Sequence, residues 1–166
     1  MALLAVDAGR SEVEVKSMNG IKVFPSAVCE AVRIHNPQLL EGDLEIEVDN
    51  QKWWVGNLAE REGSRFKRNN FGDSKADPIL KVQVIAAAIY SGLASGSVEL
   101  GILVPVEGYT KEERKKLGAI LKGRHENTYN LVEESKKAPK NKPCIFTIED
   151  KILIAQVGAA AYWSDP

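Results

Sequence analysis

An acidic residue and a glycine stand together at the first predicted turn of the chain. Asp7 follows the apolar stretch Leu3 to Val6, and Gly9 comes two residues later, before a second predicted strand. A carboxylate at a strand end beside a glycine can approach a metal ion and a phosphate, because no side chain stands in the way. The pattern therefore suggests a nucleotide-binding turn. An aspartate that only caps a tight turn is the alternative.

A glutamine late in the chain is the second candidate for chemistry. Gln156 follows the predicted apolar strand Ile152 to Ala155. At the mouth of a strand, a polar tip can hold a water molecule in line for phosphoryl transfer. The alternative is a glutamine that caps the helix predicted over Val157 to Trp163.

The composition is that of an ordinary globular domain. The 166 residues are 44% apolar and 27% charged, with a formal net charge of −1. This length is close to the roughly 150 residues of one domain, and a near-neutral charge offers no general attraction for nucleic acid or anionic lipid. The sequence shows neither the pattern of a cleavable leader nor an apolar run of roughly 18 to 20 residues. We therefore expect a cytoplasmic protein with no membrane partner.

The two cysteines do not form a pattern. Cys29 and Cys144 are far apart in sequence and have no metal-type spacing with His35 or His125. Neither a disulfide framework nor a zinc site is indicated. We expect two buried, reduced thiols.

The first part of the chain predicts two antiparallel units. Three short strands are expected over Leu3 to Val6, Glu12 to Lys16 and Ile21 to Phe24, and Asn19-Gly20 between the last two is a strong hairpin signal. A second hairpin joins strands over 44–48 and 53–55. It belongs to a small lobe inserted at about residues 30–75.

The rest of the chain alternates helices and strands. Asp77-Pro78 caps a core helix that runs to Gly92. The next element, Val98 to Val106, is a strand typical of parallel sheets. The capping box Thr110-x-x-Glu113 then opens a second helix, which Gly123 closes. Further strands over 128–132, 144–148 and 152–155 precede the final helix. The order predicts an α/β, ribonuclease H-like domain, whose mixed sheet contains an antiparallel meander and is flanked by helices.

Five segments carry a family resemblance over essentially the whole chain. They are AVDAGRSEVEVK, VFPSAV, WWVGNLAE, LGILVPVEGYTKEERKKLGAILKG and FTIEDKILIAQVGAAAYW. Their order and spacing are similar to those of the N-terminal half of bacterial actin-like proteins of the plasmid-segregation type, the ParM and Alp group of the actin/Hsp70 superfamily.

The resemblance implies an actin-fold ATPase that forms filaments and takes part in plasmid or DNA segregation. ATP and magnesium would lie in a cleft between two domains, of which this chain is the first. Asp7 would hold magnesium through water, and backbone amides around Gly9, Arg10 and Ser11 would meet phosphate oxygens. Gln156 would orient the attacking water. The implied partners are further copies of the protein, or an actin-like partner, and DNA through an adaptor.

Two departures from the family argue against activity of this chain alone. The family usually has a lysine where this chain has Glu14, and a carboxylate about 4 Å from a phosphate repels it by about 4 kcal/mol at an effective dielectric of ~20. Lys16 shares that strand face but lies about 6.6 Å further along, so it could replace the lysine only if the hairpin were shorter or bulged. In addition, a second domain with its own phosphate hairpin is absent from the 166 residues. We expect ATPase activity only in a two-domain protein.

Other functions stay open. A non-enzymatic half-actin that binds an actin-like filament is the main alternative. A nuclease of the same topology would use Asp7 as its first metal ligand and Glu107 as a second, but lacks a persuasive third carboxylate. The basic and aromatic segment SRFKRNNFGDSK, residues 64–75, indicates a solvated loop more than a DNA site, and the resemblance adds a subunit contact as a further possibility.

Overall fold

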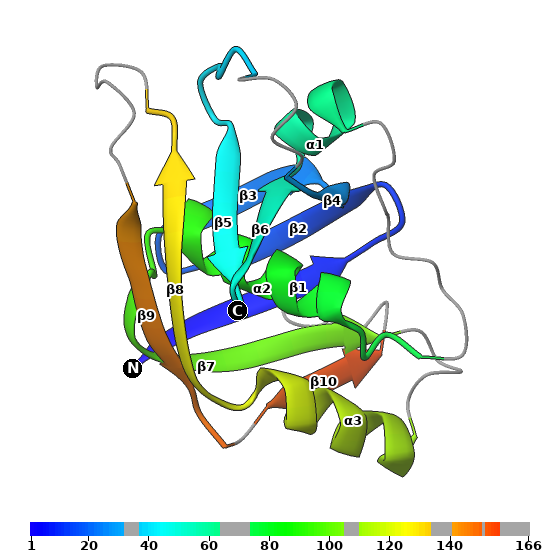
Figure 1. Ribbon diagram of the computed structural model, residues 1–166. Coiled ribbons are helices and arrows are strands. Elements are labelled where there is room, and N and C mark those ends of the chain that lie inside the picture. Colours follow the sequence, from blue (N-terminus) through cyan, green and yellow to red (C-terminus); the bar gives the residue numbers. More distant parts are fainter. Residues whose placement is uncertain (32–36, 64–73, 105–109, 134–140, 151, 157–166) are drawn as a thin grey trace.

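One curved sheet and three helices make up the described part of the protein. The computed structural model describes residues 1–31, 37–63, 74–104, 110–133, 141–150 and 152–156. The strands are β1 (Ala2–Ala8), β2 (Glu12–Ser17), β3 (Gly20–Pro25), β4 (Val28–Glu30), β5 (Leu44–Val48), β6 (Gln51–Val55), β7 (Ser95–Val104), β8 (Gly123–Leu131), β9 (Lys142–Ile148) and β10 (Leu153–Gln156). The helices are α1 (Asn57–Glu62), α2 (Pro78–Tyr90) and α3 (Lys111–Leu121) (Figure 1).

The sheet is mixed, as the sequence predicts. Its strand order is β3-β2-β1-β7-β9-β8-β5-β6-β4, with β10 also paired to β7. The antiparallel meander β1-β2-β3 is confirmed, and so is the turn predicted over Met18-Asn19-Gly20: Ser17 pairs with Gly20, which has a φ of 105°. The second hairpin is confirmed too. Its turn residues Asp49 and Asn50 both have positive φ, which suits the twist of a two-residue hairpin loop.

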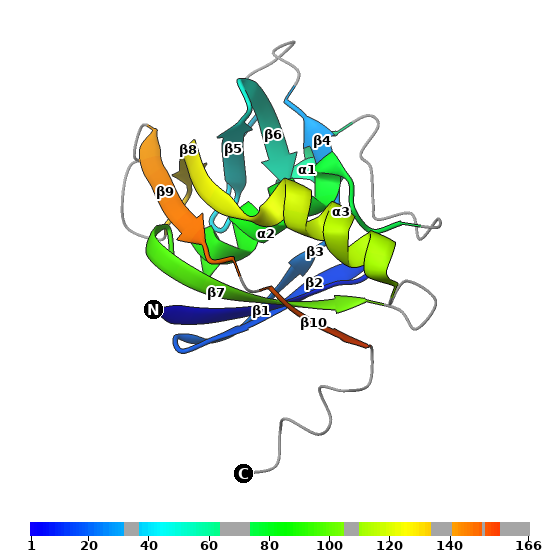
Figure 2. The same cartoon turned by 90° about the horizontal axis from the view of Figure 1, so that it is seen from below.

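Strand β7 forms the parallel centre of the sheet. It pairs with β1 along one edge through Val98 to Ile102. Along the other edge it pairs first with β9 and then with β10 (Figure 2). All three pairings are parallel, and Val98, Leu100 and Val104 are fully buried, as expected for a strand covered on both sides.

Helix α2 fills the inside of the curved sheet. The Asp77 side chain accepts a hydrogen bond from the Leu80 amide, and Pro78 occupies the first turn, so both predicted start signals are confirmed. Nine residues of α2 are buried. The helix contacts β1 and β2 on one side and β4, β5 and β6 on the other, and the sheet therefore wraps around it.

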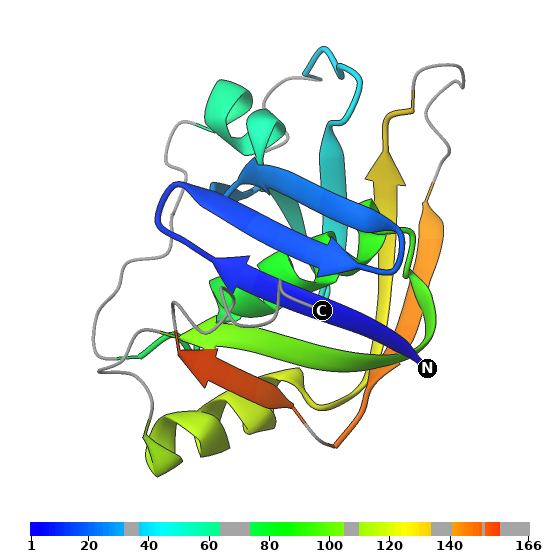
Figure 3. The ribbon, with the colours of Figure 1, turned by 180° about the vertical axis from the view of Figure 1, so that it is seen from behind.

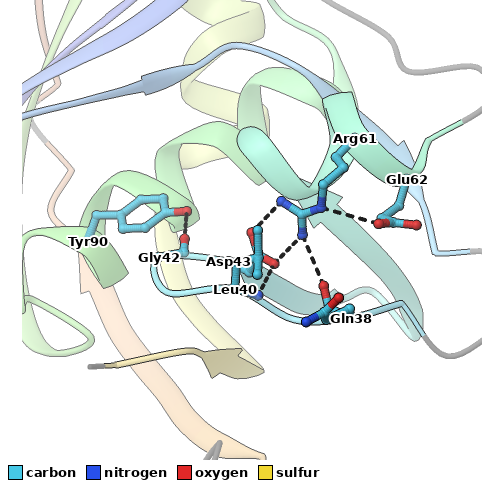
Figure 4. Close-up of polar contacts among 7 residues, drawn as sticks. All are labelled: Gln38, Leu40, Gly42, Asp43, Arg61, Glu62 and Tyr90. Carbon is cyan, nitrogen blue, oxygen red and sulfur yellow. Dashed lines mark hydrogen bonds and ion pairs between the residues drawn. The ribbon is translucent and has the colours of Figure 1, made fainter. Parts of the chain in front are cut away.

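Strands β5, β6 and β4 form one end of the same sheet, beyond the pairing of β5 with β8, and with α1 we call them the lobe. It has a small core of its own, formed by Ala27, Cys29, Trp54, Leu58 and Ala59. An ion pair between Arg61 of α1 and Asp43 holds the loop before β5 against the helix, and Arg61 also donates to the Gln38 carbonyl (Figure 4). Sequence reasoning missed α1, because its six residues are too few for a helical period and no side chain caps it.

Strand β8 is longer than the predicted strand over 128–132. It begins at Gly123, and its inward positions include the polar residues His125 and Asn127. A strand that buries polar side chains lacks the apolar alternation on which the prediction rests. Lys122 is the C-cap of α3, and Gly123, with a φ of 96°, follows that cap as predicted and also starts β8.

Two general expectations concern the whole chain. Cys29 and Cys144 are buried and unpaired, as expected, and burial raises the pKa of the Cys144 thiol to about 12. Within the described residues, no helix has the length and apolarity needed to cross a membrane. The helix predicted over 157–163 lies outside the described residues, as does Glu107.

Candidate functional site

The predicted phosphate turn connects β1 and β2. The Gly9 amide donates a hydrogen bond to the Glu12 carbonyl at 2.9 Å, which closes the turn. A Cβ atom at position 9 would lie 2.8 Å from the Glu12 oxygen, so this position requires glycine. Arg10 and Ser11 form the exposed tip, where backbone amides can face a ligand.

Two carboxylates face each other at the base of this turn. Asp7 of β1 pairs with Glu14 of β2, and the register is regular over five residue pairs. Both side chains lie on the sheet face opposite to the buried Leu4 and Val6, because successive residues of a strand alternate. The Asp7 side chain is 30% exposed. Two like charges directly across a strand pair are unfavourable, so a positive charge nearby would stabilise this base.

Lys75 supplies positive charge there, and sequence reasoning missed it. Its Nζ donates to the carbonyls of Ala8 at 3.2 Å and Leu103 at 2.9 Å, between the ends of β1 and β7. It lies 3.9 Å from Asp7 Oδ1. The side chain is only 7% exposed, so the prediction that the segment ending at Lys75 is a solvated loop is wrong for this residue. Burial lowers the pKa of the ammonium, and Asp7 partly opposes that shift.

Glu113 fixes the backbone from which Lys75 extends. Its buried carboxylate accepts hydrogen bonds from the Lys75 amide at 2.6 Å, the Ala76 amide at 3.2 Å and the Ser74 hydroxyl at 2.8 Å. The Thr110 hydroxyl accepts from the Glu113 amide, as the capping box predicts. In a complete capping box the Glu113 side chain would also accept a hydrogen bond from the Thr110 amide. Here its carboxylate faces residues 74–76 instead.

Ser26 and Gln83 brace the turn from the other side. The Ser26 hydroxyl donates to the Arg10 carbonyl at 2.7 Å, and the Ser26 amide donates to the Ser11 carbonyl at 2.9 Å. Gln83 of α2 donates in turn to the Ser26 carbonyl at 2.7 Å. Ser26 and Gln83 are fully buried, so the turn is tied to the core helix through groups that water does not reach.

The backbone of Gln156 ends strand β10 at the same edge of the sheet as the turn. Gln156 pairs with Val104 of β7, while Val6 of β1 pairs with Ile102. Val104 lies two residues beyond Ile102 on β7, and Ala8 lies two residues beyond Val6 on β1, so Val104 and Ala8 are at the same level of the sheet. The carboxyl ends of β1, β7 and β10 therefore meet at one edge, which carries both Asp7 and Gln156.

Lys16 is placed further from the turn. It pairs with Ala5, two residues before Asp7, and the β1–β2 register contains no bulge that would move it forward. Its predicted contact with a nucleotide stays a prediction, and the register offers it no support. Residues 64–73, with the other basic side chains of the segment before Lys75, lie outside the described part of the chain.

A hollow of about 440 Å³ lies in the lobe and not at the turn. It is lined by Leu40, Glu41, Asp43, Asn57, Glu60 and Arg61. The Asp43 carboxylate accepts from the Leu40 amide at 2.7 Å and is paired with Arg61, and the Tyr90 hydroxyl donates to the neighbouring Gly42 carbonyl at 2.9 Å (Figure 4). Through these contacts the cluster acts as a structural support of the lobe.

Several solved structures with a similar fold are of actin-like proteins. The chain is 18% identical to the archaeal actin homologue Ta0583, with a TM-score of 0.74 over 98% of this chain and 47% of that one. It is 16% identical to ParM of Bacillus thuringiensis, with a TM-score of 0.68 over 98% of this chain and 47% of that one. For the AlfA filament bound to AMPPNP the identity is 18% and the TM-score 0.68, over 96% and 56% of the two chains. The chain thus spans about half the length of these proteins.

Comparison with a protein family indicates the same relationship. Residues 5–156 match the family described as the N-terminal domain of actin-like proteins. No curated protein sequence matches the chain. The matched range contains the turn after β1, Lys75, Glu113 and the end of β10. The chain therefore belongs to the actin-like proteins and constitutes their N-terminal domain, with the mixed, ribonuclease H-like sheet that its sequence predicts.

Proposed function

We propose that this chain is the N-terminal half of a filament-forming, actin-like ATPase that takes part in plasmid or DNA segregation. It contributes the first phosphate-binding turn of an ATP site completed by a second domain. Asp7 holds magnesium through water, the turn that Gly9 closes presents the amides of Arg10 and Ser11 to the phosphates, and the Gln156 side chain orients the attacking water.

The observation that carries this proposal is the common edge formed by the carboxyl ends of β1, β7 and β10. It brings the acid of the turn and the backbone of Gln156 to one side of the sheet, although they are separated by most of the chain. Ligands of open α/β sheets bind at such edges. A partly exposed carboxylate also suits magnesium, which keeps several waters and takes the rest of its ligands from phosphate.

The relatives support the cofactor and the assembly. Ta0583 has been solved in complex with ADP, and AlfA as a filament bound to AMPPNP. For this chain we infer ATP with magnesium as the cofactor, further copies of the protein as the filament partner, and DNA reached through an adaptor.

Glu14 favours a second candidate function. Its carboxylate faces Asp7 where a phosphate would approach, so a domain that binds an actin-like filament without turning over ATP has a specific argument behind it.

The test uses the native gene product, read from its complete frame. We expect magnesium-dependent phosphate release from ATP and sedimentation of polymer with ATP, and Asp7→Asn should abolish the former by removing the carboxylate charge. Gln156→Ala should slow turnover while ATP binding persists. A protein that binds no ATP and forms no polymer would contradict the proposal. Co-sedimentation of such a protein with an actin-like filament would support the second candidate.

A further inference from the structure

The base of the turn between β1 and β2 needs a cation if it is to receive a nucleoside triphosphate. Asp7 and Glu14 face each other there, and a polyphosphate would add further negative charge. A carboxylate and a phosphate in contact repel each other, and the repulsion is stronger in a protein site than in bulk water because the effective dielectric is lower. A cation that approaches from another element would offset this repulsion.

We infer that Lys75 is this cation, and that it binds the terminal phosphates of the triphosphate in place of the lysine that the turn lacks at Glu14. The inference rests on the proposed function and deepens it. It assigns the role of the phosphate-binding cation to a residue from the segment before α2, 68 positions after Asp7.

The position of the Lys75 ammonium supports this assignment. It lies between the carboxyl ends of β1 and β7, held by the carbonyls of Ala8 and Leu103, and 3.9 Å from Asp7 Oδ1. Ala8 directly precedes Gly9, so the ammonium stands at the root of the turn whose amides would meet the same phosphates. A lysine with 7% exposure has lost most of its hydration, and an anionic ligand would compensate for that loss.

Glu113 acts as a positioning residue for Lys75. Its carboxylate bonds to the amides of Lys75 and Ala76 and to the Ser74 hydroxyl, and its own amide is held by Thr110. Asp77 caps α2 directly after this segment. The Lys75 backbone is therefore fixed from both sides, and the side chain is the part that would turn its ammonium from Asp7 towards a phosphate.

Two alternative assignments of the charged groups lead to different results. If Lys75 only pairs with Asp7, its loss would lower stability and leave nucleotide discrimination unchanged. If Lys16 is the phosphate cation, its loss would reduce ATP binding and the loss of Lys75 would not. Lys81 is a matched control. It lies on α2, the helix that Lys75 precedes, and it pairs with the exposed Asp49 of the β5–β6 turn.

The experiment compares the binding of MgATP, MgADP and AMP to the native gene product and its variants by calorimetry or competition. Lys75→Met should weaken MgATP binding by about tenfold to a hundredfold, the range for loss of a charge-assisted contact. AMP binding should be unchanged, and Lys75→Arg should retain part of the MgATP affinity. Lys81→Met should bind all three ligands as the wild type does. Lys16→Met discriminates between the two lysines, because the inference predicts a smaller loss of MgATP affinity for it than for Lys75→Met.

Glu113 variants test the positioning role. Glu113→Ala should lower the ratio of MgATP to AMP affinity, and Glu113→Gln should restore most of it because an acceptor oxygen remains for the amides. Thermal melts of each variant separate loss of fold from loss of discrimination. An unchanged ratio in a folded Glu113→Ala protein would overturn this role.

The outcomes separate the inference from the proposed function. Wild-type protein that binds MgATP, together with a folded Lys75→Met protein that binds it equally well, would overturn the inference and leave the proposed function standing. Wild-type protein that binds no nucleotide would overturn the proposed function itself.

Discussion

At the scale of single residues, Glu14 is the feature of the turn that argues most against the proposed nucleotide binding. It faces Asp7 in a regular register. We expect Glu14→Lys in the native gene product to strengthen MgATP binding by about tenfold, because a repulsive charge becomes an attractive one. Titration with a fluorescent ATP analogue measures the effect. Glu126→Lys, the same charge change on the exposed side of β8, should leave the affinity unchanged. Equal gains in both variants would mean that net charge, not position, is responsible.

His125 makes stability depend on pH. It lies inward on β8, bonded through Nε2 to the Leu121 carbonyl at 2.7 Å and stacked on Phe146. Burial lowers its pKa below 6.5, so the folded state favours the neutral ring. Its contribution is complete above pH 6.5 and is lost as the pH falls through the lowered pKa of the folded state.

Urea unfolding between pH 7.5 and 5 checks this expectation. The wild type should lose more stability on acidification than His125→Gln, which keeps a donor but cannot gain a proton. Parallel loss in the two proteins would show that other groups are responsible.

Asp7, Gly9 and Gln156 could be selected from the sequence because each stands next to a short apolar strand. Lys75 could not, since its partner Asp7 is far away in sequence and its neighbours read as a polar loop. The sequence held only an indirect signal: a turn with two acids and no lysine needs a cation from elsewhere.

At the scale of elements, the brace between the turn and α2 is the contact to test. Ser26 is fully buried and donates to the Arg10 carbonyl. Ser26→Ala should lower the free energy of unfolding by about 1 to 2 kcal/mol, because the part-buried hydrogen bond to the Arg10 carbonyl is lost. Chemical denaturation gives the value. Ser17→Ala removes the exposed hydrogen bond from the Asn19 amide to the Ser17 hydroxyl in the β2–β3 turn, and it should cost less than about 0.5 kcal/mol. Similar losses for both would contradict the role of the brace.

The lobe depends on its ion pair between α1 and the loop before β5. Asp43 is 2% exposed and Arg61 is 32% exposed. Arg61→Ala should therefore cost about 2 kcal/mol or more, because it leaves a buried carboxylate without its guanidinium. Arg124→Ala breaks a pair whose side chains are 63% and 64% exposed and should cost less than about 0.5 kcal/mol in the same unfolding assay. A loss in Arg61→Ala no larger than in this control would mean that Asp43 remains solvated.

Elements with a clear period or cap could be predicted, and the others could not. Helix α2 has both a side-chain cap and a first-turn proline, and the β2–β3 turn has its Asn-Gly step. Helix α1 has neither cap nor length, and β8 hides its alternation by burying His125 and Asn127. Local signals thus predict an element only when its environment does not demand polar residues inside.

At the scale of the whole molecule, the sequence predicted the class of sheet but not the order of its strands. A buried apolar strand such as β7 indicates parallel neighbours, yet nothing in its residues shows that β9 and β10 follow each other along one edge. Pairing between β5 and β8, which joins the lobe to the main sheet, is equally invisible, because contacts between distant segments depend on how the sheet closes around α2.

The curvature of the sheet leaves its outer face open over β1, β2 and β3, where no described helix lies (Figure 3). Ile21 and Val23 of the edge strand β3 are 69% and 53% exposed on this face. Apolar side chains on an exposed edge promote association between chains. The 166-residue chain should therefore self-associate as its concentration rises, and the double variant Ile21→Thr/Val23→Thr should do so less. Threonine keeps the β-branched shape that suits a strand.

Analytical ultracentrifugation over a range of concentrations measures this association. Ile145→Thr is the control, because Ile145 is 38% exposed on the internal strand β9, both of whose edges are already paired. Its weight-average mass should follow that of the wild type, whereas the double variant should stay closer to a monomer at the same melting temperature. If all three proteins have the same mass at every concentration, the outer face of the meander does not drive association, and charges beside it, such as Glu14 and Lys16, are enough to keep it apart from other copies.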